Sequence, residues 1–467
     1  MTDPAQPPAA PPGAPVPTPS GRLDADRMLV LAGIAVVAVL LAGMAMLVVL
    51  RSSRQADATA SPTIAAAAAT AGSTPRLPSR SPAVFATPAP ATPAATGSIE
   101  EQIAAVEAEV VPIRQLDPTA PVPNRIIDTA ELADLVRADF DASNPPATLH
   151  AAEALLERLR LLPAGTDLRA LELEARSSQV LGFYDFRTKQ MTIVRRSGGF
   201  GPLEKVTLAH EYTHALQDQH FGIDRLGLST PDQGDRVLAR TALVEGDATL
   251  SMTQWMLGNL TPAELGQVGS ESSDPAAQAV LDRMPPLLRR ELLFPYLEGA
   301  ILVSRLFASG GWQAVDDAYA RPPDSTEQVL HPDKYLAHEQ PIAVTLPPAT
   351  GLGSGWRLSA SDTAGELVTQ VWLGTAMSPD AAAAAAAGWG GDRIGSYDGP
   401  GGRWAIAWLT AWDDPGAAVR FEPAAQIVAG TFAHARVIEH VLSSSVAILV
   451  ASDGATLDDL AATVVRP

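Results

Sequence analysis

Residues 201–222, GPLEKVTLAHEYTHALQDQHFG, predict the helix around which the structure of this protein is organised. Pro202 suits the first turn of a helix, where its missing N–H is not needed, and Gly222 suits the position just past a helix end. The pattern therefore predicts one continuous helix between them. Because residues four apart share a helix face, His210 and His214 can direct two imidazole nitrogens at a single point.

The HEYTH motif on this helix contains the groups that metal-assisted hydrolysis needs. Imidazole nitrogen is a preferred ligand of Zn²⁺, and the sequence has no cysteine, so a transition-metal site must use histidine and carboxylate. Glu211 lies beside the two histidines, where its carboxylate can reach a metal-bound water without being a ligand itself. Three fixed residues also recur by chance, and the metal-free alternative is an exposed helix with two ordinary surface histidines. The motif thus predicts a zinc site with Glu211 as general base.

The surrounding sequence predicts a folded catalytic region at about 101–345. A strand hairpin is expected just before the motif, with strands at about 180–184 and 190–194 around a polar turn. Helical periodicity marks further helices at about 129–140, 149–162, 236–257, 286–306 and 312–319. The Pro-rich segment 320–335 is expected to be a loop.

A second, smaller domain is expected at 355–467, after a Pro- and Gly-rich boundary at 346–354. Its strands are predicted at about 393–397, 404–410, 433–440 and 446–451. Its helices are predicted at about 364–373 and 381–387, and from about 415 and 457 onward. Four tryptophans are expected as core or cleft-lining aromatic residues, namely Trp389, Trp404, Trp408 and Trp412. Both regions mix helices with strands, so the predicted fold class is α+β.

The N-terminal part predicts a membrane anchor. Residues 28–50, MLVLAGIAVVAVLLAGMAMLVVL, carry no charge and would span about 34 Å as a helix. A cleaved signal peptide is the alternative, but its apolar region is usually shorter. The Pro-rich tail at 1–27 and the Ala/Pro/Thr/Ser-rich linker at 51–100 cannot bury a core. Arginines on the two sides of the span balance, so charge does not set the orientation; the stalk-like linker favours a single-pass protein of the cell membrane with its catalytic part extracytoplasmic.

The overall charge argues against a nucleic-acid partner. The chain carries a formal net charge of −19, with no excess of Lys and Arg to displace counterions from phosphate. The partners that remain are a lipid bilayer, contacted through residues 28–50, and the substrate of the predicted hydrolase.

With HEYTH on one predicted helix and VEGDA on the next, the sequence resembles the gluzincin branch of zinc metallopeptidases. The blocks HALQDQHF, PPDSTEQVLHPDKY and GWGGDR are also similar to those of uncharacterised bacterial zincin-like proteins. The resemblance implies a zincin-like fold in which His210, His214 and Glu245 hold Zn²⁺ and Glu211 is the general base. It further implies a peptide or protein substrate, which would pair with an edge strand of the hairpin, taken as 190–194.

Two rival functions belong to other classes. A zincin-fold scaffold could display a binding surface at the cell envelope without catalysis, although Glu211 would then have no use. A soluble interaction module without metal would leave both HEYTH and VEGDA unexplained.

The third ligand has two candidates. His220 stands where the metzincin pattern HExxHxxGxxH has its third histidine, but Gln217 replaces the glycine that lets the chain leave the helix. If the helix continues, His220 lies about 120° around the axis from the second ligand. Glu245 on the next helix is therefore favoured, with Ala242 and Gly246 small enough to let that helix approach the HEYTH helix closely.

Other residues are weaker candidates. Asp218 could accept the second ring N–H of His214, or it could be a solvated acid at the helix end. His331, Tyr296 and Tyr335 are candidates to stabilise an oxyanion, against a structural role for each.

Overall fold

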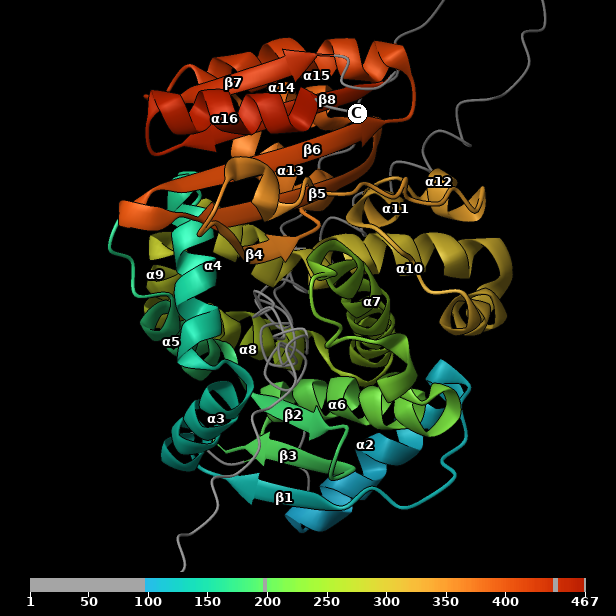
Figure 1. Ribbon diagram of the computed structural model, residues 1–467. Helices are drawn as coiled ribbons and strands as arrows, with labels where there is room; N and C mark the ends of the chain where they lie inside the picture. The colour runs from blue at the N-terminus through green and yellow to red at the C-terminus, as the bar shows by residue number, and fades with distance from the viewer. Residues whose placement is uncertain (1–96, 196–199, 440–443, 466–467) are drawn as a thin grey trace, which may run out of the picture.

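The computed structural model describes residues 97–195, 200–439 and 444–465. The predicted tail at 1–27, the predicted transmembrane helix at 28–50 and nearly all of the predicted linker lie outside the described residues. The described chain is an α+β structure in which helices predominate, with a small mixed sheet and a five-stranded antiparallel sheet (Figure 1). This agrees with the predicted α+β class.

A three-stranded sheet contains the predicted hairpin. Its strands, in the order β1-β3-β2, are β1 (Asn124–Ile127), β3 (Gln190–Val194) and β2 (Gly182–Asp185). β3 pairs in parallel with β1 and antiparallel with β2. The prediction that 190–194 is an edge strand is therefore wrong, because β3 is the central strand and β2 lies at the edge. The missing partner was β1, whose four residues are too few to show a strand pattern.

Helices make up most of the described chain. Before the motif lie α2 (Ile99–Arg114), α3 (Thr129–Ser143), α4 (Pro146–Arg158) and α5 (Leu168–Gln179). The motif helix is α6 (Pro202–Phe221), followed by η3 (Ile223–Leu226), α7 (Gly234–Asn259), α8 (Pro262–Ser272), α9 (Pro275–Arg283), α10 (Pro286–Ala320), α11 (Thr326–Leu330) and α12 (Pro332–Leu336). The loop predicted at 320–335 is wrong in part, because Ser325 caps α11 and Pro332 begins α12.

Helices α7 and α10 touch through their backbones. A Cβ at Gly246 would lie 2.2 Å from the carbonyl oxygen of Gly299, and a Cβ at Gly299 would lie 2.2 Å from the carbonyl oxygen of Ala242. The prediction that Ala242 and Gly246 let α7 approach the HEYTH helix is therefore wrong, because their close contact is with α10. Ala242 and Gly246 therefore set the distance between α7 and α10.

Helix α10 is long and apolar. It bends at Gly310 and Gly311, whose φ is 66°, in agreement with the two helices predicted on either side. Within the described residues, α10 is the one helix whose length and composition would suffice to cross a membrane, and half of its most apolar stretch is buried inside the protein.

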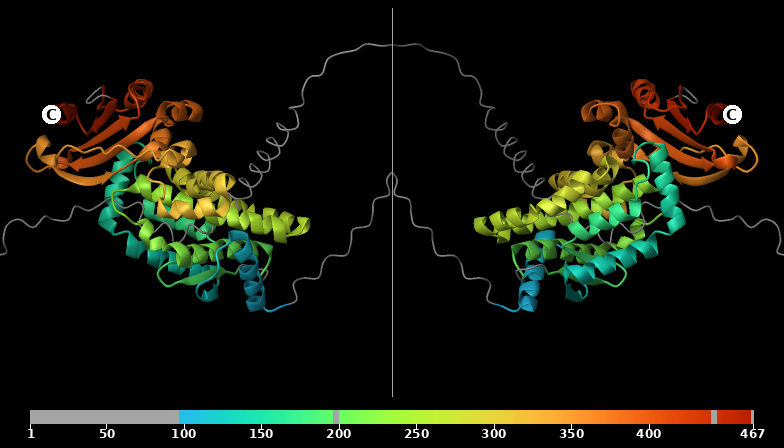
Figure 2. Two further views of the ribbon diagram at one scale, coloured as in Figure 1. Left: turned by 90° about the vertical axis from the view of Figure 1, so that its right-hand side faces the viewer. Right: turned by 90° about the vertical axis from the view of Figure 1, so that its left-hand side faces the viewer.

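A five-stranded antiparallel sheet lies at the C-terminal end of the molecule (Figures 1 and 2). Its strands, in the order β4-β5-β6-β8-β7, are β4 (Arg357–Asp362), β5 (Trp389–Asp398), β6 (Trp404–Trp412), β8 (Ser445–Ala451) and β7 (Ala435–Glu439). One face packs against α16 (Gly454–Val465) and η4 (Ala349–Leu352), and the other packs against α13 (Gly365–Leu373), α14 (Pro379–Ala386) and α15 (Pro415–Ala429). A short turn, η5 (Pro400–Gly402), joins β5 to β6. β4 is an addition to the four predicted strands, and the predicted core tryptophans Trp389, Trp408 and Trp412 are buried.

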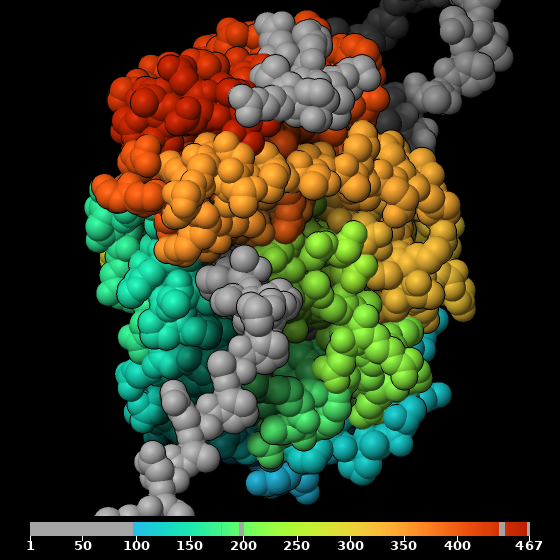
Figure 3. Space-filling model, in the orientation of Figure 1, coloured from blue at the N-terminus to red at the C-terminus, as the bar shows by residue number. Residues whose placement is uncertain are grey.

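Polar contacts join this sheet and α11 to the first turn of α7. The Gly234 N–H donates to Asp362 of β4 at 2.7 Å, and Asp235 accepts from the Thr326 N–H of α11 at 3.0 Å. Gly365 has φ of 76°, and a Cβ there would lie 1.8 Å from the Asp235 carboxylate. The largest apolar cluster includes residues of the helical region and of the C-terminal sheet, and atoms of the two regions lie against one another along their visible border (Figure 3). The helix that carries Glu245 is thus anchored in the C-terminal sheet.

Candidate metal centre

The motif helix α6 has well-defined ends. Glu204 accepts from the Gly201 N–H at 2.9 Å, which satisfies a free donor at the start of the helix. Gly222, with φ of 67°, closes the helix in the left-handed conformation that favours glycine. The predicted helix from Pro202 to Phe221 is confirmed, and it keeps His210 and His214 on one face.

Three ligand-type atoms converge between α6 and α7. His210 Nε2 lies 3.1 Å from His214 Nε2, and Glu245 Oε2 lies 3.2 Å from the first nitrogen and 3.3 Å from the second. All three side chains are buried, with at most 2% of any of them exposed. Donor atoms bound at about 2.0–2.1 Å to a tetrahedral zinc ion lie roughly 3.3 Å apart. A proton can satisfy one pair of these atoms, whereas a cation satisfies all three, so the group could hold a metal ion.

The charges of this group are coupled. Burial alone would raise the pKa of Glu245, but the two histidines outweigh burial and lower it to about 2. Burial also opposes the charged form of His214, but Glu245 and Glu211 raise its pKa to about 9. The pKa of His210 is lowered, mainly by burial. The group by itself therefore holds a positive charge on His214 against Glu245, and a metal ion would take the place of that charge.

Glu211 is fully buried beside these side chains. Neither of its carboxylate oxygens has a hydrogen-bond partner among the described residues. The Tyr184 N–H of edge strand β2 lies near enough to lower the pKa of Glu211, but burial outweighs it and raises the pKa to about 8. A buried carboxylate without donors costs stability, so its place is explained by chemistry better than by packing.

The ring nitrogen of His214 that faces away from the metal group contacts Gln217 and not Asp218. Gln217 Oε1 lies 2.8 Å from His214 Nδ1. Asp218 instead accepts from the Tyr184 hydroxyl at 3.0 Å and pairs with Lys189 at 2.8 Å, so the prediction that it supports His214 is wrong. Spacing could have identified Gln217, because a residue three positions after His214 lies on the same helix face.

His220 points away from the group, as the continuous helix predicts. Its Nε2 lies 2.7 Å from the backbone oxygen of Asp117, on the segment that follows α2. The candidate metal group contains Glu245 and not His220.

One of the three candidates for oxyanion stabilisation lies at the group. The ring of Tyr296 is 6.3 Å from that of His210, and its buried hydroxyl has no hydrogen-bond partner among the described residues. Burial raises the pKa of Tyr296 well above its ordinary value, and Glu245 adds to the effect. His331 instead pairs with Glu366 at 2.9 Å, and the Tyr335 hydroxyl donates to the backbone oxygen of Arg321 at 2.9 Å.

A buried ion pair supports α7 two residues beyond Glu245, and sequence reasoning missed it because its partner lies on a distant helix. Arg114 of α2 donates to both oxygens of Asp247, at 2.6 and 3.0 Å, and the Tyr319 hydroxyl donates to Asp247 at 2.7 Å. The pair ties α2 and α10 to the ligand helix. Asp247 belongs to the VEGDA string, so that string supplies both a ligand-type residue and its structural support.

A second carboxylate group lies between α11, α12 and the C-terminal sheet. Glu327, Glu339 and Asp413 bring oxygens within 4.8 Å of one another. The Lys334 ammonium already contacts all three, at 2.7 Å from Glu327 and 2.6 Å from Glu339. This group therefore contains its own cation.

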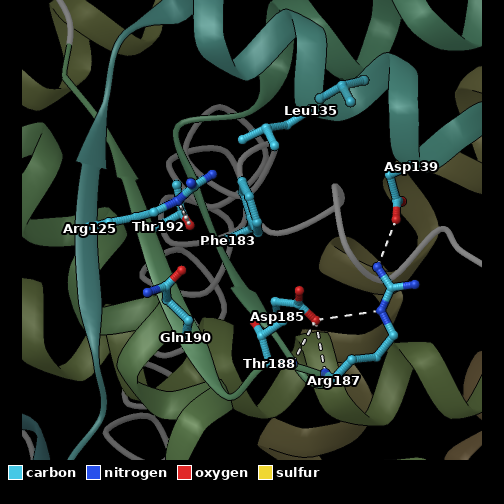
Figure 4. A pocket seen from close by; sticks show the side chains of 10 residues that line it. Arg125, Leu135, Asp139, Phe183, Asp185, Arg187, Thr188, Gln190 and Thr192 are labelled. Carbon is cyan, nitrogen blue, oxygen red and sulfur yellow. Dashed lines mark hydrogen bonds and ion pairs between the residues drawn. The ribbon is translucent and has the colours of Figure 1, made fainter.

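A cavity of about 230 Å³ lies on the face of the three-stranded sheet opposite α6 (Figure 4). Arg187 pairs with Asp139 at 2.9 Å at one end of the cavity, and Arg125 lies near Thr192 at the other. Its lining includes Phe183 but none of the metal-group residues. The cavity is separate from the metal group.

Comparison with known proteins assigns the C-terminal part alone. A family described as "Domain of unknown function (DUF8575)" matches residues 356–464, which include all five strands of the C-terminal sheet. No curated protein and no solved structure gives a match to the chain. Any function must therefore be argued from the metal group itself.

Proposed function

We propose that this protein is a zinc-dependent metallopeptidase of the gluzincin type, with a zincin-like catalytic region that includes α6 and α7. The proposal rests on one observation: the buried group His210, His214 and Glu245 lies beside Glu211, whose buried carboxylate has no hydrogen-bond partner among the described residues. A purely structural metal site has no need of that carboxylate. A non-catalytic scaffold leaves Glu211 unexplained.

Zinc bound by the three side chains would supply an acidified water and a polarised carbonyl group. Glu211 would accept a proton from the attacking water and deliver it to the leaving amine. Burial raises the pKa of Glu211 to about 8 in the metal-free group, and the positive charge of a bound zinc ion would lower that pKa and favour the carboxylate that accepts a proton. The Tyr296 hydroxyl is the best-placed donor for the oxyanion.

Edge strand β2 is where an extended peptide would pair. The Val194 N–H donates to the Leu181 oxygen at 3.0 Å, so by antiparallel alternation the backbone groups of Gly182 and Tyr184 point away from β3. A Cβ at Gly182 would lie 3.0 Å from Thr207 of α6 and 3.5 Å from Glu211. The glycine thus keeps this edge close to the proposed base, where β-strand addition would place a peptide bond.

The test is Glu211→Gln in the purified full-length chain, with zinc content and hydrolysis of a peptide library measured together. The amide keeps the shape of the side chain but loses the basic oxygen, so we expect unchanged zinc content and a loss of hydrolysis of about 10²-fold or more. Glu204→Gln is the matched control, because Glu204 lies on the same helix and serves its N-terminus; hydrolysis should persist. Wild-type turnover by a zinc-loaded Glu211→Gln chain would disprove the role of Glu211 as general base. A zinc-loaded wild type that cleaves no peptide would favour the non-catalytic scaffold.

A further inference from the structure

We propose that Gln217 is a positioning residue: one amide fixes which nitrogen of His214 faces the metal group and ties that histidine to the helix of Glu245. The inference rests on the proposed function. Gln217 is fully buried, with Oε1 2.8 Å from His214 Nδ1 and Nε2 donating to the Val244 oxygen at 3.0 Å. Val244 immediately precedes Glu245 on α7.

The chemistry of these contacts determines the position of one proton. The Val244 carbonyl oxygen can only accept a hydrogen bond, so the NH₂ end of the amide must face it. The other end is then an oxygen, which also only accepts, and the His214 Nδ1 opposite it must carry the N–H. His214 Nε2, the atom facing His210 and Glu245, is then the nitrogen whose proton a metal ion would replace.

The two histidines of the motif differ in this respect. His210 Nδ1 is buried and has no hydrogen-bond partner among the described residues. His214 is the histidine with a defined orientation, and the residue that orients it also contacts the second ligand helix. Gln217 is also the residue that replaces the metzincin glycine, so the same position keeps the helix straight and supports a ligand.

A residue that only joins two helices would have no special effect on metal binding, and the chain provides a control for that possibility. Gln219, two residues later, also bridges α6 to another segment: it accepts from the Thr119 N–H at 2.6 Å and donates to the Ala120 oxygen at 3.0 Å. It makes three backbone hydrogen bonds, with the Thr119 and Ala120 N–H groups and the Ala120 oxygen, and none with the metal group, whereas Gln217 makes one backbone hydrogen bond and contacts His214. Gln217→Met and Gln219→Met therefore each remove a bridge from α6 to another segment, and Gln217→Met also removes a contact with a ligand-type histidine.

The experiment measures zinc affinity of the purified full-length chain by competition with a chromophoric chelator, at one pH and without substrate. We expect Gln217→Met to lower zinc affinity by about 10- to 100-fold, the usual effect of losing a partner behind a metal ligand, and Gln219→Met to change it by less than about 2-fold. Gln217→Glu keeps an acceptor for His214 and should retain more affinity than Gln217→Met. It also remains informative if the methionine variant fails to fold.

Equal affinities for Gln217→Met and Gln219→Met, or for Gln217→Met and Gln217→Glu, would overturn the positioning role. A wild type that binds no zinc would overturn the proposed function and this inference together. A wild type that binds zinc tightly but hydrolyses no peptide would disprove the proposed peptidase activity and would not affect the proposed role of Gln217.

Discussion

Two groups of three ligand-type side chains in this protein differ in what neutralises their charge. The group of His210, His214 and Glu245 is buried from solvent, and no lysine or arginine contacts its converging atoms among the described residues. In the group of Glu327, Glu339 and Asp413, the last two side chains are 40% and 28% exposed, and the Lys334 ammonium contacts all three carboxylates.

The difference shows that such a group is open to a metal ion where its balancing charge is a proton that the metal can replace, as on His214, and not where it is an ammonium attached to the chain. In the second group the Lys334 ammonium supplies the positive charge. Lys334 with Glu327, Glu339 and Asp413 therefore forms an ion-pair cluster between α12 and the C-terminal sheet, which we call the latch. In the first group the converging lone pairs belong to imidazole and carboxylate, which suit zinc. The following predictions test this contrast, beginning with the largest expected effect.

Removing one side chain from each group should separate them most clearly. Glu245→Ala should lower zinc affinity by about 10³-fold or more, because it removes one of three protein ligands. Glu339→Ala should leave both the affinity and a stoichiometry of about one zinc per chain unchanged. His220→Ala should also leave the affinity within about 2-fold. Metal titration of the four proteins checks this, and a larger loss for His220→Ala than for Glu245→Ala would reverse the choice of third ligand.

Removing the Lys334 ammonium should make the carboxyl group cluster dependent on a metal ion. Lys334→Met leaves three carboxyl groups facing one another without their shared hydrogen-bond donor and positive charge, so we expect the free energy of unfolding to fall by about 2–4 kcal/mol. Oxygen ligands suit calcium, so added Ca²⁺ in the millimolar range should restore part of that loss.

Chemical denaturation with and without Ca²⁺ measures both effects. Arg305→Met is the control, since Arg305 forms an exposed pair with Asp333 at 3.5 Å and should contribute less than about 1 kcal/mol. A Lys334→Met protein as stable as the wild type would show that the lysine does not hold the latch.

The smallest expected effect is in the pH dependence of the latch. Burial raises the pKa of Glu327 to about 8, although Lys334 opposes the shift. The folded protein then binds this proton more tightly than the unfolded chain, so the stabilisation is complete below the ordinary carboxyl pKa and disappears as pH rises through about 8. Wild-type stability should fall between pH 5 and pH 9 by about 1–3 kcal/mol more than that of Glu327→Gln.

Urea denaturation at the two pH values measures this difference. Other buried carboxyls such as Asp235, whose pKa burial raises to about 7, contribute with the same sign in both proteins and cancel. Parallel pH profiles would show that Glu327 is ionised throughout.

The sequence predicts the local features of the site because each of them depends on residues that are close together in the sequence. Pro202 and Gly222 define α6, and the spacing of His210 and His214 then places both on one helix face. The continuous helix also turns His220 outward. Glu245 came from resemblance to a family, and the structure places its carboxylate with the two histidines.

Features that depend on distant segments could not be read in this way. Strand β1 lies far from β3 in sequence, and without it the hairpin gives no sign of which strand is at the edge. The Arg114–Asp247 pair joins residues that are 133 positions apart. Ala242 and Gly246 were recognisable as small, but only the folded chain shows that the helix they approach is α10 and not α6.

The backbone contact between Gly246 and Gly299 has a consequence for mutational screens. Neither residue has a side chain or a ligand atom, and yet a single methyl at either would collide with a carbonyl oxygen and displace α7, which carries Glu245, from α10. A screen for loss of function would therefore score both glycines with the ligands themselves. Suppressor mutations that restore a Gly246→Ala protein should arise on α10, where a shift in helix spacing can make room, and not among the histidines.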